Sequence, residues 1–96
     1  MTTETKKIIL DAIRDTTDGI EGIYKTQGIK YRDRLEEDIG FDSLDRVEFF
    51  MSIEDRANIR IPSRIYNSLT TLKEIGKFIY SPEKYIERQI RINPNH

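Results

Sequence analysis

The chain has 96 residues, of which 36% are hydrophobic and none is cysteine, and its net charge is −1. This size allows one small domain with a modest core, and the lack of cysteine excludes disulfides and thiolate metal sites. No apolar run approaches the roughly 20 residues of a membrane span, and the stretch 1–13 lacks the apolar core of a secretory signal, so we expect a soluble cytoplasmic protein that needs no membrane.

The charges are unevenly distributed along the chain. Residues 33–55 contain nine acidic residues and two arginines, a charge of −7, whereas the remainder carries +6. A surface of one sign steers encounters with oppositely charged partners. The acidic segment therefore predicts partners with basic patches and gives no indication of nucleic-acid binding. A solvated acidic loop without a partner would have the same composition.

The first part of the chain predicts one amphipathic helix and a long loop. Ile9, Ala12 and Ile13 recur at helical spacing within residues 5–17. The following residues up to 42 include four glycines and no sustained apolar period, which indicates a loop. We expect it to be pinned to the core by four apolar side chains: Ile20, Ile23, Ile29 and Leu35. A loop of that length in a small domain is uncommon and is usually functional.

The rest of the chain predicts further helices and no convincing strand, so the expected class is all-α. A second helix begins at Asp42 or Ser43, either of which could be its N-cap, and runs to about Ala57. The Ile-Pro-Ser step at 61–63 ends one element and opens a short turn or helix. A Thr-capped helix follows within residues 70–80.

Pro82 indicates the start of a last short helix, because proline is tolerated at the first helical position. We divide the chain into a domain at 1–80 and an extension at 81–96, whose final residues are expected to fray.

The second helix has apolar residues on two sides. At 100° per residue from Leu44, one set lies between about 140° and 240° and another between about 300° and 360°. The first set is Phe49, Phe50, Ile53 and Ala57, and the second is Leu44, Val47 and Met51. The second set lies among Glu48, Glu54 and Asp55, an arrangement that suits partner docking through apolar anchors framed by charge. A wide core stripe is the alternative, and Arg46 near 200° fits the division only if it lies under the preceding loop.

Ser43 stands in an acidic stretch, LEEDIGFDSLD, without the groups that would make it a nucleophile. The single histidine is His96, no lysine follows in S-x-x-K spacing, and no glycine-rich cofactor loop precedes a helix. The D-x-D-x-D-G spacing of a calcium loop is missing as well. We therefore expect neither catalysis nor a metal, and interpret Ser43 as a helix cap or as a hydroxyl that another enzyme modifies. A phosphodiester would be stabilised at a helix N-terminus.

The stretch Gly40–Asp45, GFDSLD, resembles the Asp-Ser-Leu attachment motif of acyl carrier proteins. The similarity continues through VEFFMSIED, the Ile61-Pro62 step and TTLKEIGKFI, and covers roughly residues 35–79. The resemblance implies a four-helix bundle with a long first loop, here with a possible extra C-terminal helix. It also implies a 4'-phosphopantetheine arm, installed on Ser43 by a phosphopantetheinyl transferase from coenzyme A, which carries acyl groups as thioesters for fatty-acid, polyketide or lipid-biosynthetic enzymes.

The resemblance also assigns roles to residues around Ser43. Asp42 and Leu44 flank the attachment residue, and the positions that dock acyl-transferring, condensing or modifying enzymes are Asp45, Val47, Glu48, Met51, Glu54 and Asp55. A monomer is expected. Arg56, Arg60 and Arg64 depart from the acidic pattern of the family, which suggests a specialised carrier. Two alternatives stay open: an aminoacyl or peptidyl carrier of a nonribosomal system, and a helical interaction module that carries no arm.

Overall fold

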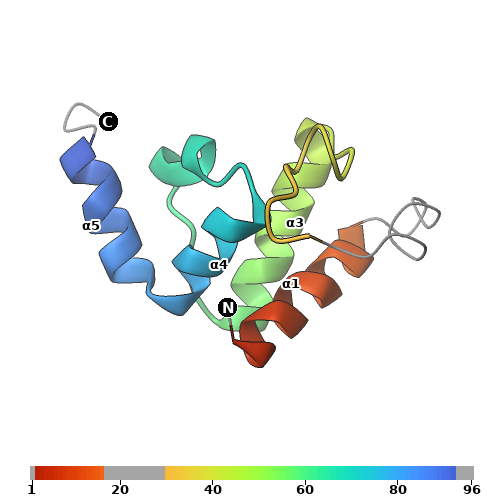
Figure 1. The fold of residues 1–96 in the computed structure, drawn as a ribbon, viewed down its shortest axis with the longest axis horizontal. Helices are drawn as coiled ribbons and strands as arrows, with labels where there is room; N and C mark the ends of the chain where they lie inside the picture. Colours follow the sequence, from red (N-terminus) through yellow and green to blue (C-terminus); the bar gives the residue numbers. More distant parts are fainter. Residues whose placement is uncertain (1, 17–29, 93–96) are drawn as a thin grey trace.

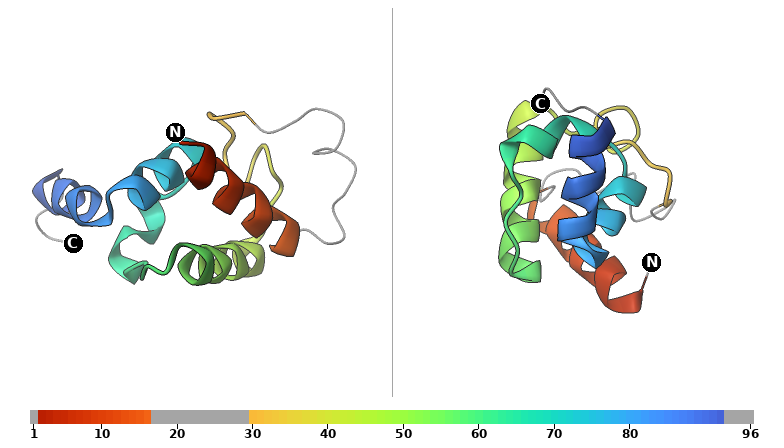
Figure 2. Two further views of the ribbon diagram at one scale, coloured as in Figure 1. Left: turned by 90° about the horizontal axis from the view of Figure 1, so that it is seen from below. Right: turned by 90° about the vertical axis from the view of Figure 1, so that its left-hand side faces the viewer.

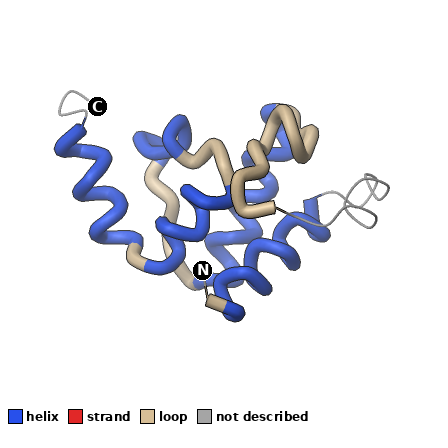
Figure 3. Tube along the Cα trace, in the orientation of Figure 1, coloured by secondary structure: helices blue, strands red, loops and turns tan. Residues whose placement is uncertain are grey.

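The computed structural model describes residues 2–16 and 30–92, and these are folded into helices joined by loops (Figure 1). The elements are α1 (Thr3–Thr16), α3 (Ser43–Ala57), the 3-10 helix η1 (Ser63–Ser68), α4 (Leu72–Tyr80) and α5 (Pro82–Ile92). Figure 3 shows no strand in the described part of the chain. The predicted all-α class is confirmed. Ile20, Ile23 and Ile29, which we expected to pin the long loop, lie outside the described residues.

In the network of helix contacts, α4 connects α1 with α5. α1 contacts both α3 and α4, whereas α5 contacts α4 and η1. The views in Figure 2 place α5 at the end of the molecule away from α1, and the principal extents are 40 × 26 × 22 Å. The acidic helix α3 and the C-terminal helix α5 therefore lie in different parts of the fold.

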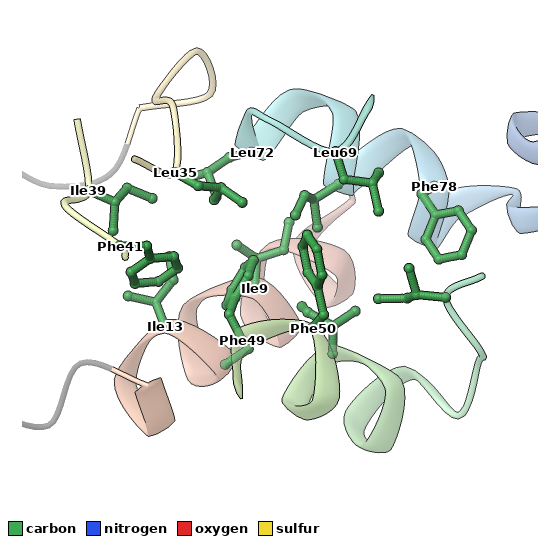
Figure 4. Close-up of a cluster of buried hydrophobic side chains, with 14 of the residues drawn as sticks. Ile9, Ile13, Leu35, Ile39, Phe41, Phe49, Phe50, Leu69, Leu72 and Phe78 are labelled. Atoms are coloured by element: carbon green, nitrogen blue, oxygen red, sulfur yellow. The ribbon is translucent and has the colours of Figure 1, made fainter. Parts of the chain in front are cut away.

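The core is apolar and draws side chains from every described element. Ile9 and Ile13 come from α1, and Phe49 and Phe50 project from α3 into the same cluster (Figure 4). The rings of Phe49 and Phe50 are 6.1 Å apart, a spacing typical of favourable aromatic pairs. Ile13 is 2% exposed and Phe49 is fully buried, so burial of these residues holds α3 against α1.

The C-terminal helix α5 joins the core through Tyr85. This side chain is 5% exposed, and its ring meets that of Phe78 edge-on at 5.7 Å. Its hydroxyl donates to the Glu74 carboxylate at 2.9 Å and lies 3.0 Å from the Ser68 hydroxyl. Burial raises the pKa of Tyr85 to about 12. The residues after 80 thus begin with a packed helix, while the division at residue 80 stays a prediction.

The loop that precedes α3 is fixed at several points. The Leu35 N–H donates to the Thr70 carbonyl, and the Leu72 N–H donates to the Asp33 carbonyl. Gly40 has φ +87°, a left-handed conformation that residues with a Cβ rarely adopt. The next residue, Phe41, is 3% exposed, and its ring lies 5.3 Å from that of Phe49. The glycine turn and the buried Phe41 together set where α3 begins.

Candidate functional site

The N-terminus of α3 is closed by a capping box. Asp42 is the N-cap: its Oδ1 accepts a hydrogen bond from the Asp45 N–H at 2.8 Å, and its own N–H donates to Asp45 Oδ2 at 3.1 Å. These bonds satisfy backbone donors that a helix start leaves free. Of the two predicted caps, Asp42 is therefore the one that caps the helix. Ser43 is the first helical residue.

The Ser43 side chain is exposed at this capped helix start. No described residue forms a hydrogen bond with its hydroxyl, so this oxygen stabilises no contact in the described part of the chain. The helix dipole at this end favours an added negative group, and the neighbouring Asp42 carboxylate opposes it in part. The exposed position of Ser43 leaves room for an added group, and the helix N-terminus would favour the charge of a phosphodiester there.

The exposed side of α3 carries the apolar residues that the helical period separated from the core. Leu44 is 65% exposed, Val47 is 45% exposed and Met51 is 58% exposed. The wide core stripe, our alternative for these residues, is therefore wrong. On the opposite side Phe49, Phe50 and Ile53 are all buried, and Ala57 is half-buried.

The predicted partner-binding carboxylates differ in their surroundings. Glu48 and Asp55 are exposed, and no described residue pairs with either. Asp45 belongs to the capping box, and the half-buried Glu54 accepts a hydrogen bond from the Ile61 N–H at 2.8 Å. Asp45 and Glu54 thus stabilise the ends of α3 within the chain itself. Glu48 and Asp55 are the carboxylates left free for a partner.

Two clusters near α3 were not predicted as units. In one, Asp15 of α1 accepts hydrogen bonds from Arg56 at 2.7 Å and from the Ser52 hydroxyl at 2.8 Å. These two hydrogen bonds, that from Arg56 first, hold the pKa of Asp15 below its ordinary value. Arg56 stands where the family pattern continues with acid, and its partner lies on another helix. The sequence pattern of α3 alone therefore could not reveal the pair.

In the second cluster, Arg46 bonds with Glu36, so it does lie against the preceding loop as its position near 200° required. Its further contacts with η1 were not foreseen.

Two other kinds of site are absent from the described residues. These residues contain no group of three or more His, Asp or Glu that could hold a metal ion. None of the described helices is long and apolar enough to cross a membrane. His96 lies outside the described residues.

Known proteins match this chain over most of its length. Residues 11–79 match the family described as "Phosphopantetheine attachment site". The chain is 32% identical to an acyl carrier protein of Streptomyces coelicolor over 74 residues, which cover 77% of this chain and 80% of the relative. It is also 32% identical to the acyl carrier protein AcpP of Rhizobium meliloti, covering 77% and 83%. An acyl carrier protein of Cyanidioschyzon merolae is 27% identical over 88% of this chain and 91% of its own length.

The family match over residues 11–79 defines a phosphopantetheine-dependent carrier domain. The chain belongs to the acyl carrier protein family. Its cofactor is 4'-phosphopantetheine, attached covalently, and the protein is a carrier rather than an enzyme. Membership implies interaction with a phosphopantetheinyl transferase and with biosynthetic enzymes. The arm supplies the thiol that a protein without cysteine lacks.

Proposed function

We propose that Ser43 bears the 4'-phosphopantetheine arm and that the protein presents acyl thioesters from this position to its partner enzymes. The observation that carries the proposal is the exposed Ser43 hydroxyl, which no described residue engages, at the capped start of α3. A transferase can reach such a hydroxyl without unfolding the domain. Asp42 holds the helix start in place, and Leu44 is the exposed apolar residue next to the attachment point.

The exposed side of α3 is the proposed docking face. Val47 and Met51 provide apolar contact area, and Glu48 and Asp55 provide charges that orient a partner with a basic patch. Asp45 contributes negative charge to the same end of the helix while it completes the capping box. We propose that the protein works as a monomer, because a second copy on this face would compete with its partners. We also propose that it works in the cytoplasm.

The charge pattern supports a carrier for a dedicated set of enzymes. Arg60 and Arg64 are exposed and follow directly after the acidic helix, where the family pattern is acidic. Partners suited to a wholly acidic carrier would meet repulsion there. Asp45 and Glu48 favour the acyl branch over the aminoacyl and peptidyl carriers of nonribosomal systems. Loading assays with acyl-activating and amino-acid-activating enzymes decide between those branches.

The test of the attachment site is the mass of the intact protein after incubation with coenzyme A and a broad-specificity phosphopantetheinyl transferase. We expect one arm on the wild-type chain and none on Ser43→Ala. Ser63→Ala is the matched control, because Ser63 is also exposed and also begins a helix. Loading of Ser43→Ala, or an unmodified wild-type chain with several transferases, would overturn the proposal and favour a helical interaction module.

A further inference from the structure

Arg46 lies one helical turn after Ser43, and the two side chains leave α3 about 60° apart. Residues three apart on a helix are neighbours, and long side chains in a helix lean toward its N-terminus. Arg46 therefore reaches toward the end of α3 where Ser43 lies. Unlike Ser43 it is largely covered, with its side chain 20% exposed.

The Arg46 guanidinium joins three segments of the chain. Nη2 donates to the Tyr66 carbonyl of η1 at 2.9 Å, and Nη1 pairs with Glu36 Oε1 of the preceding loop at 3.3 Å. Its central carbon lies 5.6 Å from the centroid of the Phe50 ring, a cation–π distance. Phe50 is 1% exposed and belongs to the core shown in Figure 4. Arg46 thus covers a core ring from the side on which the loop and η1 meet.

One donor of this side chain is not satisfied. Nε is buried and has no hydrogen-bond partner among the described residues. A buried donor without an acceptor costs free energy, so the covering position of Arg46 depends on its bonds to Glu36 and Tyr66 and on the Phe50 ring. Loss of one of these contacts should free the side chain to move.

Arg46 forms part of the wall of a pocket of about 220 Å³. Its lining consists of Leu35, Glu36, Glu37, Arg46, Asn67 and Thr70. Apart from Leu35 these side chains are polar. Arg46 lines this pocket and also covers the Phe50 ring, so a group tethered at Ser43 that entered the core through the pocket would reach the ring only after Arg46 had moved.

We propose that Arg46 is a specificity-determining residue that closes the way from the attachment site to the apolar core, so that this carrier holds short or polar cargo outside the core. The proposal rests on the attachment of the arm to Ser43. A long alkyl chain gains by burial in proportion to its length, but entering here it must first break the contacts of Arg46. With Arg46 in place that gain is not realised, and the thioester stays open to solvent whatever the chain length.

The experiment uses butyryl, octanoyl and dodecanoyl coenzyme A, from which a broad-specificity transferase installs acylated arms directly. The rate of thioester cleavage by hydroxylamine and the midpoint of thermal unfolding are measured for each chain length. For the wild type we expect the same cleavage rate and midpoint with all three groups. For Arg46→Ala we expect cleavage to slow severalfold from butyryl to dodecanoyl and the midpoint to rise by about 5 °C.

Glu36→Ala removes one contact of Arg46 at an exposed position. It should change the chain-length dependence of both measurements in the same direction as Arg46→Ala, by a smaller amount. The exposed Arg64→Ala is the control and should behave as the wild type. Slower thioester cleavage of the dodecanoyl group than of the butyryl group in the wild type would overturn the role of Arg46. So would the absence of such slowing in both Arg46→Ala and Glu36→Ala. Either result would leave Ser43 as the attachment residue. If no arm is added to any of these proteins, the attachment proposal fails, and the proposed role of Arg46 fails with it.

Discussion

The two sides of α3 carry apolar residues of similar size in opposite surroundings. Phe49 and Ile53 are fully buried against the other helices, whereas Leu44 and Met51 are more than half exposed. A contiguous set of exposed apolar side chains is typical of a surface that binds partners transiently. One short helix therefore holds the domain together with one side and offers the other to partners.

The same contrast appears among the polar residues of α3. Ser52 and Arg56 bond to Asp15 of α1, and Arg46 bonds to the loop and to η1. Glu48 and Asp55 bond to no described residue. Charges with partners inside the fold stabilise one arrangement of the helices, while free charges set the rate at which a partner of opposite sign arrives.

The largest expected difference between the two sides is in stability. Phe49→Ala should lower the free energy of unfolding by roughly 3 to 5 kcal/mol, because it leaves a cavity beside Phe41 and Phe50. Met51→Ala, a truncation on the exposed side, should change it by no more than about 0.5 kcal/mol. Urea denaturation measures both. A loss of similar size in the two variants would mean that Met51 is part of the core in solution.

The next difference is in the rate of partner binding. Glu48→Lys with Asp55→Lys should slow loading by a transferase with a basic docking patch about tenfold at low salt, and less at high salt. The matched control is Glu83→Lys with Glu87→Lys on α5, which makes the same change in net charge away from α3 and should leave the rate nearly unchanged. Equal slowing by both pairs would show that the loading rate depends on the net charge of the protein and not on the α3 surface.

The smallest expected effect is a change in acid stability at the contact between α1 and α3. The pKa of Asp15 is held below its ordinary value of 3.8 by its hydrogen bonds from Arg56 and Ser52. This contribution is fully present above pH 3.8 and is lost as the pH falls below that value through the folded-state pKa. Asp15→Asn should therefore flatten the fall in unfolding midpoint below about pH 4.

The contribution is small because the Asp15 side chain is 48% exposed. Glu83→Gln, at an exposed position of α5, serves as the control. A profile unchanged by Asp15→Asn would contradict a role for this pair in joining the helices.

Local signals in the sequence were enough to place most of the described helices. Asp42 caps α3, Thr71 caps α4, and Pro82 begins α5, each through bonds or backbone angles within a few residues. The period of 3.6 likewise separated the two sides of α3, since burial follows directly from where a helix faces the core.

What the sequence could not predict depends on contacts between distant residues. The bond from Arg56 to Asp15 spans 41 residues, and that from Arg46 to Tyr66 spans 20. A charge on a helix can serve the fold or a partner, and periodicity does not distinguish the two. For the same reason Glu54 was expected to face partners only, although its carboxylate also binds the Ile61 N–H.

The attachment of the arm at the boundary between the two sides is tested most directly by peptide mapping of the loaded protein. Trypsin cleaves after Arg34 and Arg46, and the peptide 35–46 contains Ser43 as its only hydroxyl-bearing residue. Tandem mass spectrometry should find one 4'-phosphopantetheine on that peptide and none on any other. An arm on a peptide that contains Ser63 or Ser68, with 35–46 unmodified, would contradict the account.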